Sequence, residues 1–198
     1  MEERLISFHE KLTEFLHQKL SLVLVIVGVF IFIALIISGI KYYFQYKERK
    51  AGQLLLSASP QNSKVLKNLV EKYPSTRAGL EACLILFVQA YQKGNYKLAQ
   101  KYLKIFKSHA SSYFIPIANY GLGKIQEEKK LFDRAITIYQ KNVKKLRPLD
   151  LYLYLDLARL SKKAGDLAAA KRYYQAVLSE FPDSGFSSLV KYELWVLQ

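Results

Sequence analysis

Residues 94–106 read GNYKLAQKYLKIF, and two later segments follow the same pattern. These segments are KLFDRAITIYQKN at residues 130–142 and GDLAAAKRYYQAV at residues 165–177. Their shared alanines, which lie 36 and 35 residues apart, are Ala99, Ala135 and Ala170. A repeat of this length predicts an all-α fold of stacked helix pairs, because each pair must bury its apolar face against the next.

Each repeated segment follows an apolar stretch with helical spacing. These stretches lie at residues 80–91, 117–125 and 151–160. Each unit is therefore predicted to be a first helix (helix A), a short turn and a second helix (helix B). The alanine of helix B lets the two helices approach closely, and a bulky residue four positions later fills the space beside it. The bulky residues are Leu103, Tyr139 and Tyr174.

A weaker unit precedes these three. YPSTRAGLEACLIL at residues 73–86 resembles FPDSGFSSLVKYEL at residues 181–194, and their prolines lie 108 residues apart, which is three periods of 36. We therefore expect residues 63–73 to form helix B of a degenerate first repeat. Its helix A is expected to grow out of the preceding apolar segment through residues 47–56.

The end of the chain and the turns complete the repeat pattern. Residues 187–197 are expected to form a closing helix, with Trp195 against the last repeat, so that about 3.5 repeats stack into a continuous core. The turns are marked by Gly94 and Gly165, because glycine allows the chain to reverse sharply. The residues expected to accept hydrogen bonds from free amides at the start of each helix B are Asn95, Asp133 and Asp166.

Together these positions resemble the signature of the tetratricopeptide repeat. That signature has a leucine followed by a small residue in helix A, an aromatic residue after the turn and a proline after helix B. The matching residues are Leu122, Gly123, Leu157, Ala158, Tyr96, Phe132, Pro148 and Pro182. The resemblance implies an α-α solenoid of tetratricopeptide-like units.

A long apolar segment precedes the repeats. Residues 20–40 read LSLVLVIVGVFIFIALIISGI and carry no charge. A helix of that length is about 32 Å long, enough to cross a hydrocarbon core roughly 30 Å thick. A buried core helix or a cleaved signal peptide is disfavoured, because the run is too long for either. We expect one permanent transmembrane anchor at residues 20–44. The residues that define it are Leu20, Ile40, Tyr42 and Tyr43, the tyrosines being suited to the headgroup layer.

The leader at residues 1–19 has apolar residues at helical spacing, which are Leu5, Phe8, Leu12, Phe15 and Leu16. It is either an amphipathic helix on the membrane surface or a polar leader to the anchor. Three basic residues precede the apolar run at residues 20–40 and four follow it closely, so charge does not decide the orientation in the membrane. The remaining regions are expected to be a connecting segment at residues 45–62 and a repeat domain at residues 63–198.

The positive charge is concentrated after the anchor. Residues 47–198 carry 26 basic and 12 acidic residues, which accounts for the whole net charge of +14. Such a surface favours anionic lipid headgroups, nucleic acid or an acidic protein, with nucleic acid ranked below lipid, unless the charge serves only solubility. The lysines on two of the B helices are Lys97, Lys101, Lys104 and Lys107, and Lys141, Lys144 and Lys145.

No Gly-rich phosphate loop, paired carboxylate site or nucleophile motif occurs in the sequence. The one cysteine, Cys83, lies in the apolar run EACLILFVQAY and is predicted to be a core residue rather than a nucleophile. Glu127 and Glu128 precede two lysines and are predicted to be solvated. The three histidines are scattered, so no metal or cofactor site is expected. The sequence predicts a protein that is not an enzyme.

A groove for a partner protein is expected along the A helices, which line the inner face of such a solenoid. Tyrosine and arginine are good anchors for a peptide, because they offer a large contact area with few rotatable bonds to immobilise. The alternative is that these residues are ordinary surface. By repeat register, the groove residues are Tyr91, Tyr120, Lys124, Tyr152 and Arg159.

The order of leader, single span and three to four repeats resembles the YfgM-like family, the ancillary subunits of the bacterial SecYEG translocon. Residues 71–103, EKYPSTRAGLEACLILFVQAYQKGNYKLAQKYL, are similar to a stretch of that family. The resemblance implies a single-pass protein of the bacterial inner membrane with a periplasmic repeat domain. Its implied partners are the translocon, a periplasmic chaperone and client proteins. A second relative, an outer-membrane assembly lipoprotein of similar repeats, requires a lipidated cysteine that does not occur before Cys83.

Two functional classes follow from these patterns. The first is a membrane-anchored scaffold that contacts other proteins beside a translocon. The second is a membrane-bound regulator or assembly factor whose basic domain binds anionic lipid, nucleic acid or an acidic protein on the cytoplasmic side.

Overall fold

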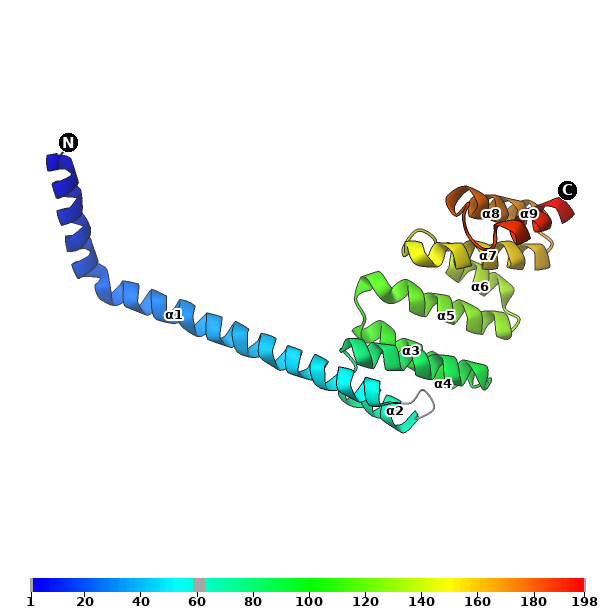
Figure 1. Ribbon diagram of the computed structural model, residues 1–198, viewed down its shortest axis with the longest axis horizontal. Helices are drawn as coiled ribbons and strands as arrows, with labels where there is room; N and C mark the ends of the chain where they lie inside the picture. The colour runs from blue at the N-terminus through cyan, green and yellow to red at the C-terminus, as the bar shows by residue number, and fades with distance from the viewer. Residues whose placement is uncertain (1, 59–62, 198) are drawn as a thin grey trace. The chain divides into compact units, whose positions relative to one another are not determined.

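The computed structural model of the chain describes residues 2–58 and 63–197, and within these ranges all regular secondary structure is helical. The prediction of an all-α fold is therefore confirmed (Figure 1). The chain divides into two units, Met1–Lys50 and Ala51–Gln198.

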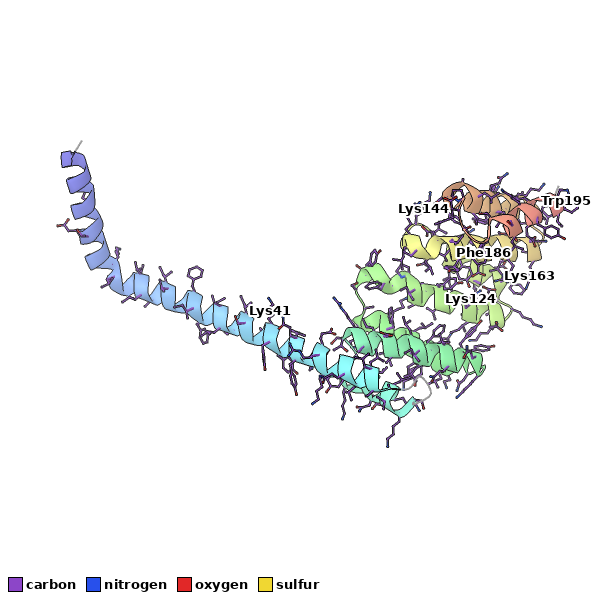
Figure 2. All side chains as sticks on the ribbon, in the orientation of Figure 1. Lys41, Lys124, Lys144, Lys163, Phe186 and Trp195 are labelled. Atoms are coloured by element: carbon purple, nitrogen blue, oxygen red, sulfur yellow. The ribbon has the colours of Figure 1, made fainter. Side chains whose placement is uncertain are left out.

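The first unit belongs to one long helix, α1 (Glu2–Ser57), whose last residues continue into the second unit. Within the segment Leu22–Ser57, an 18-residue window has a mean hydropathy of 3.2, and none of that window is buried. Among the described helices, α1 is the one long and apolar enough to cross a membrane. Lys41 is the first charge after the apolar run (Figure 2). The leader backbone is helical, but most of its side chains, including those of Leu5, Phe8, Leu12, Phe15 and Leu16, lie outside those that the structure describes.

The second unit is a stack of antiparallel helices in which each helix packs against the next along the chain (Figure 1). The described helices are α2 (Ser63–Lys72), α3 (Arg77–Gln92), α4 (Tyr96–His109), α5 (Ile115–Glu128), α6 (Phe132–Gln140), α7 (Arg147–Lys163), α8 (Leu167–Glu180) and α9 (Ser187–Val196). A short 3-10 helix, η1 (Ser112–Phe114), leads into α5. Helices α3, α5 and α7 are the A helices of three repeats, and α4, α6 and α8 are their B helices.

The core is built where the helices of each pair cross. The three shared alanines, Ala99, Ala135 and Ala170, are completely buried, as predicted. Leu103 and Tyr139, two of the bulky residues four positions later, are also almost fully buried. At the amino-terminal end, Ala51 of α1 is buried in the same cluster as Leu66 and Leu69 of α2. The solenoid core therefore begins inside the last turns of α1.

The three turns inside the repeats have one backbone design. The turn residues Gly94, Lys130 and Gly165 have positive φ angles of 70°, 59° and 82°. In each turn, the amide of this residue donates to the carbonyl oxygen three residues earlier, and the amide of the next residue donates to the carbonyl oxygen five residues before it. The N···O distances are 2.8–3.1 Å. This is the Schellman ending of a helix, in which a left-handed residue reverses the chain. The middle repeat therefore has lysine where its neighbours have glycine.

The start of helix B also differs in the middle repeat. Asn95 accepts a hydrogen bond from the Leu98 amide at 3.1 Å, and Asp166 accepts one from the Ala169 amide at 2.9 Å. These two predicted caps are confirmed. The prediction for Asp133 is wrong, because the helix begins earlier and Leu131, which has no side-chain acceptor, takes the capping position.

The closing helix α9 forms as predicted, but the placement of Trp195 is wrong. Val190 is completely buried, and Leu194 and Leu197 pack in the same cluster. These residues occupy one helix face, and at 100° per residue Trp195 lies about 140° away from Val190. The Trp195 side chain is 68% exposed, at the carboxyl-terminal end of the stack (Figure 2).

We predict that Lys130→Gly stabilises the domain. A left-handed conformation costs a residue with a side chain about 1–2 kcal/mol, and glycine avoids this cost while losing about 0.5–1 kcal/mol of chain entropy. The free energy of unfolding, from chemical denaturation in detergent followed by circular dichroism, should rise by about 0.5–1 kcal/mol. Gly94→Ala, at the equivalent position, should lower it. A Lys130→Gly variant that is less stable than the parent would contradict this account of the turn.

We also predict that Gly123→Ala destabilises the domain. A Cβ atom at Gly123 would overlap the ring of Tyr139, which is completely buried and cannot move aside. Overpacking of this kind costs about 1–3 kcal/mol, which the same denaturation experiment measures. The matched control is Gly52→Ala, because a Cβ there meets nothing within 4 Å and alanine favours the helix. Equal stability of the two variants would show that the close approach at Gly123 is unimportant.

Candidate functional site

The five predicted groove residues all lie on A helices. Tyr91 is on α3, Tyr120 and Lys124 are on α5, and Tyr152 and Arg159 are on α7. The structure brings Tyr120, Lys124 and Arg159 together around two carboxylates. It leaves Tyr91 and Tyr152 outside this group.

The two carboxylates belong to Glu127 of α5 and Asp156 of α7. Asp156 accepts hydrogen bonds from the Tyr120 hydroxyl at 2.8 Å, from Lys124 Nζ at 3.0 Å and from Arg159 Nη2 at 2.8 Å. Glu127 accepts from Lys124 Nζ at 3.3 Å and from Arg159 Nη2. We call the group, which also includes Tyr139 of α6, the α5–α7 network.

Tyr139 adds the third helix to the network. Its hydroxyl donates to Glu127 Oε1 at 2.6 Å, and its ring lies 5.5 Å from that of Tyr120 between centroids. The network therefore joins one complete repeat, α5 and α6, to the first helix of the next. Its two cations balance its two carboxylates, so no net charge is left in a partly buried site.

Tyr120, Tyr139 and Arg159 each keep one protonation state at neutral pH. Burial, followed by the interactions with Asp156, raises the pKa of Tyr120 above its usual range. Burial, followed by the hydrogen bond to Glu127, raises the pKa of Tyr139 in the same direction. Burial alone would lower the pKa of Arg159, but its bonds to Asp156 and Glu127 outweigh this and raise it. The phenols stay neutral and the guanidinium stays charged, so the network holds helices together rather than transferring protons.

The other two predicted groove residues have separate environments. The Tyr91 hydroxyl donates to Glu128 Oε1 at 2.9 Å, and its ring packs against Phe87 and Tyr96. Tyr152 is 47% exposed, with its ring 6.4 Å from that of Phe186 between centroids. Tyr152 is therefore the most accessible aromatic residue of the predicted set.

The network includes residues that sequence reasoning missed. Glu127 was expected to be solvated, yet its side chain is only 10% exposed and accepts from three donors, Lys124, Tyr139 and Arg159. Asp156 was not singled out. A signal was present, because Lys124–Glu127 and Asp156–Arg159 are opposite-charge pairs three residues apart on consecutive A helices. The cation comes first in the pair on α5, and the carboxylate comes first in the pair on α7. Each cation can therefore meet a carboxylate of the other pair when the two helices stack.

The four lysines noted on the helix that is α4 do not share one environment. Lys97, Lys101 and Lys104 are exposed and line one open depression with Asn95, Leu98 and Gln100. Lys107 instead donates to the Asn119 side chain of α5 at 2.9 Å. A second depression joins α4 to α2 and is lined by Lys67, Val70, Glu71, Leu98, Lys101, Tyr102 and Ile105.

The Cys83 thiol lies in the core, as predicted. Its side chain is completely buried, and burial raises its pKa to about 11, so the thiol is protonated at neutral pH. A thiolate is the nucleophilic form, and this thiol therefore has no access to substrate and little reactivity. Within the described residues, no group of three or more histidine, cysteine, aspartate or glutamate side chains could hold a metal ion.

Comparison with known families adds one result. A tetratricopeptide repeat model matches residues 152–184, which span most of α7, all of α8 and the turn after it. This part of the chain is therefore similar to a tetratricopeptide repeat. Repeats of this kind form a non-catalytic fold that mediates binding to other proteins. No curated protein matches the chain.

We predict that the α5–α7 network stabilises the repeat stack. Asp156→Ala removes the acceptor of three side-chain donors, two of them charged, and leaves Lys124 and Arg159 short of a partner. A hydrogen bond to a charged group contributes about 1.5–3 kcal/mol, so we expect a loss of about 2 kcal/mol in partly exposed surroundings. Asp183→Ala is the control, because Asp183 is exposed and surface substitutions change stability by about 0.5 kcal/mol or less. Equal denaturation midpoints for the two variants would contradict a stabilising network.

Proposed function

We propose that the protein is a membrane-anchored scaffold for protein–protein interaction and an accessory of the protein-translocation machinery. The observation that carries this proposal is the tetratricopeptide match to α7 and α8, within a solenoid whose A helices present polar and aromatic residues in register. On this proposal the repeat domain contacts a translocon subunit, a chaperone or a client segment. The translocon itself is proposed from the resemblance to the YfgM-like family.

The anchor has a clear part in such a function. We propose that α1 crosses the bacterial inner membrane once, with the repeat domain on the periplasmic side. A short tether holds two partners at an effective concentration near millimolar, so a weak contact becomes a persistent one. The proposed domain layout is a leader at residues 1–19, the anchor at residues 20–44, a connecting segment at residues 45–62 and the repeat domain at residues 63–198.

The proposed contact surface is the A-helix face, comprising Tyr91, Tyr120, Lys124, Tyr152 and Arg159. Tyr152 supplies its exposed aromatic ring. The Lys124 and Arg159 side chains, although bound to carboxylates, keep 30% and 38% of their surface exposed. Arginine has five N–H donors, so Arg159 can bind both the network and a carbonyl oxygen of a partner. A partner segment with apolar side chains and accessible backbone carbonyls would fit this surface.

The proposal is tested by crosslinking from the full chain in native membranes. A photoreactive amino acid replaces Tyr152, whose only aromatic neighbour in the described part of the chain is Phe186, so the fold should tolerate the change. Tyr113 of η1, which is 58% exposed, is the matched control position. We expect crosslinks to a translocon subunit or a chaperone from position 152 and not from position 113. Tyr120 is unsuitable because its replacement would also remove a bond to Asp156.

The outcomes separate the parts of the proposal. Crosslinks from position 152 to proteins without a role in translocation would keep the scaffold and remove the translocon assignment. Crosslinks from position 113 alone, or none from either position, would remove the A-helix face as the contact surface. Deletion of residues 1–46, which lies before the first core residue Ala51, should weaken the crosslinks while leaving the helical circular dichroism spectrum of the domain intact.

A further inference from the structure

Helices α2 and α4 carry exposed lysines that have no acidic partner. Two depressions connect these lysines: one is shared by Lys97, Lys101 and Lys104, and the other by Lys101 and Lys67. Within the described ranges, none of the four forms an ion pair. Glu71 is the one carboxylate among the residues that line the two depressions. We call Lys67, Lys97, Lys101 and Lys104 the basic face.

The basic face differs from three cationic side chains of the later repeats, which have carboxylate partners. Lys124 and Arg159 are held by the α5–α7 network, and Lys162 Nζ lies 2.7 Å from a carboxylate oxygen of Glu193. Their charges are therefore neutralised inside the domain. The charges of the basic face are left for an external anion.

The part of the chain that contains the basic face carries a large share of the positive charge. Residues 63–109 hold nine basic and two acidic residues, a net charge of +7. These 47 residues therefore carry half of the net charge of +14. Helix α4 alone has four lysines and no acidic residue.

The form of the basic face fits lipid headgroups better than nucleic acid. Its depressions are open, and their floors include the apolar side chains of Leu98 and Ile105. Among the residues that line them there is no arginine, and the one aromatic residue, Tyr102, is buried. Surfaces that read DNA bases commonly use arginine for bidentate contacts, and surfaces that bind single strands use exposed aromatic rings for stacking. Lysine ammonium groups above an apolar floor suit a layer of phosphate headgroups.

We propose that the basic face binds the anionic lipid surface of the membrane in which α1 is anchored. The inference rests on the anchoring proposed above. Ala51, the first core residue of the domain, follows Ile40 by 11 residues, a distance of at most about 40 Å even in an extended chain. Each lysine close to an anionic surface favours binding by about fivefold, so several lysines acting together bind firmly. Docking on lipid would hold the first repeats and leave the later A helices for a partner protein.

The test uses the full-length chain in vesicles of phosphatidylcholine, with or without phosphatidylglycerol. A donor fluorophore is attached through Gln100→Cys, which lines the basic depression, and the acceptor is on a lipid headgroup. Cys83 is completely buried, so the new cysteine is the one that reacts. We expect more energy transfer in the anionic vesicles than in the neutral ones, and a loss of this difference at high salt.

Charge reversal tests the basic face itself. Lys97→Glu, Lys101→Glu and Lys104→Glu together should lower the ratio of docked to undocked domain by at least about a hundredfold, returning energy transfer to the neutral-vesicle level. The matched control reverses three exposed lysines elsewhere, Lys129→Glu, Lys145→Glu and Lys191→Glu, with the same change in charge. The control should keep most of the energy transfer.

Three results would overturn the inference. The first is equal energy transfer in neutral and anionic vesicles. The second is an equal loss in the two triple variants, which would indicate net charge rather than a site. The third is a pair of observations: a labelled DNA oligonucleotide binds and charge reversal of the basic face abolishes this binding, whereas energy transfer is the same with and without anionic lipid. Retention of the protein in vesicles during alkaline extraction reports separately on anchoring, and crosslinking from position 152 reports separately on the scaffold function.

Discussion

The repeat domain depends on close contact between the two helices of each pair. A single pair cannot bury its apolar face, so it is stable only when stacked on neighbours. Close stacking requires a residue almost without a side chain where the helices cross, and Ala99, Ala135 and Ala170 provide it. Gly123 serves the same purpose on α5, because the ring of Tyr139 occupies the space that a side chain would need. The turns, the caps and the α5–α7 network all rely on this spacing.

The middle repeat shows how a weak local sequence can be offset by contacts between helices. It has Lys130 in a left-handed turn, Leu131 without a capping side chain, and the nine-residue helix α6. Local interactions therefore favour this repeat less than its neighbours. The α5–α7 network joins the helices on either side of α6, and Tyr139 ties α6 itself to Glu127. Several polar contacts between helices thus lie where the turn and cap contribute least.

The sequence predicted the features that depend on period and local chemistry. The spacing of the alanines placed the helix pairs, and Asn95 and Asp166 were recognised as caps because they follow turn glycines. Asp133 is not a cap, because it is the second residue of α6 and the turn before that helix puts Leu131 at the capping position. Trp195 does not pack against the last repeat, because Val190, Leu194 and Leu197 occupy the inward face of α9.

The network could be predicted only in part, because it depends on which helices become neighbours. Tyr120, Lys124 and Arg159 were chosen by repeat register, and the structure brings them together. Their partner carboxylates were overlooked, since charged residues in a lysine-rich chain are usually solvated. Glu127 and Asp156 each meet a cation from the other helix only after α5 and α7 have stacked. The groove function assigned to these residues stays a prediction.

The burial of Cys83 has a consequence for where such a domain can work. The chain has one cysteine, and its thiol lies in the core with its pKa raised by burial. The fold therefore gains nothing from disulfide formation, and it exposes no thiol for oxidants to attack. Its stability should be the same in an oxidising compartment as in a reducing one. A domain built in this way is suited to either side of a membrane without any change in its core.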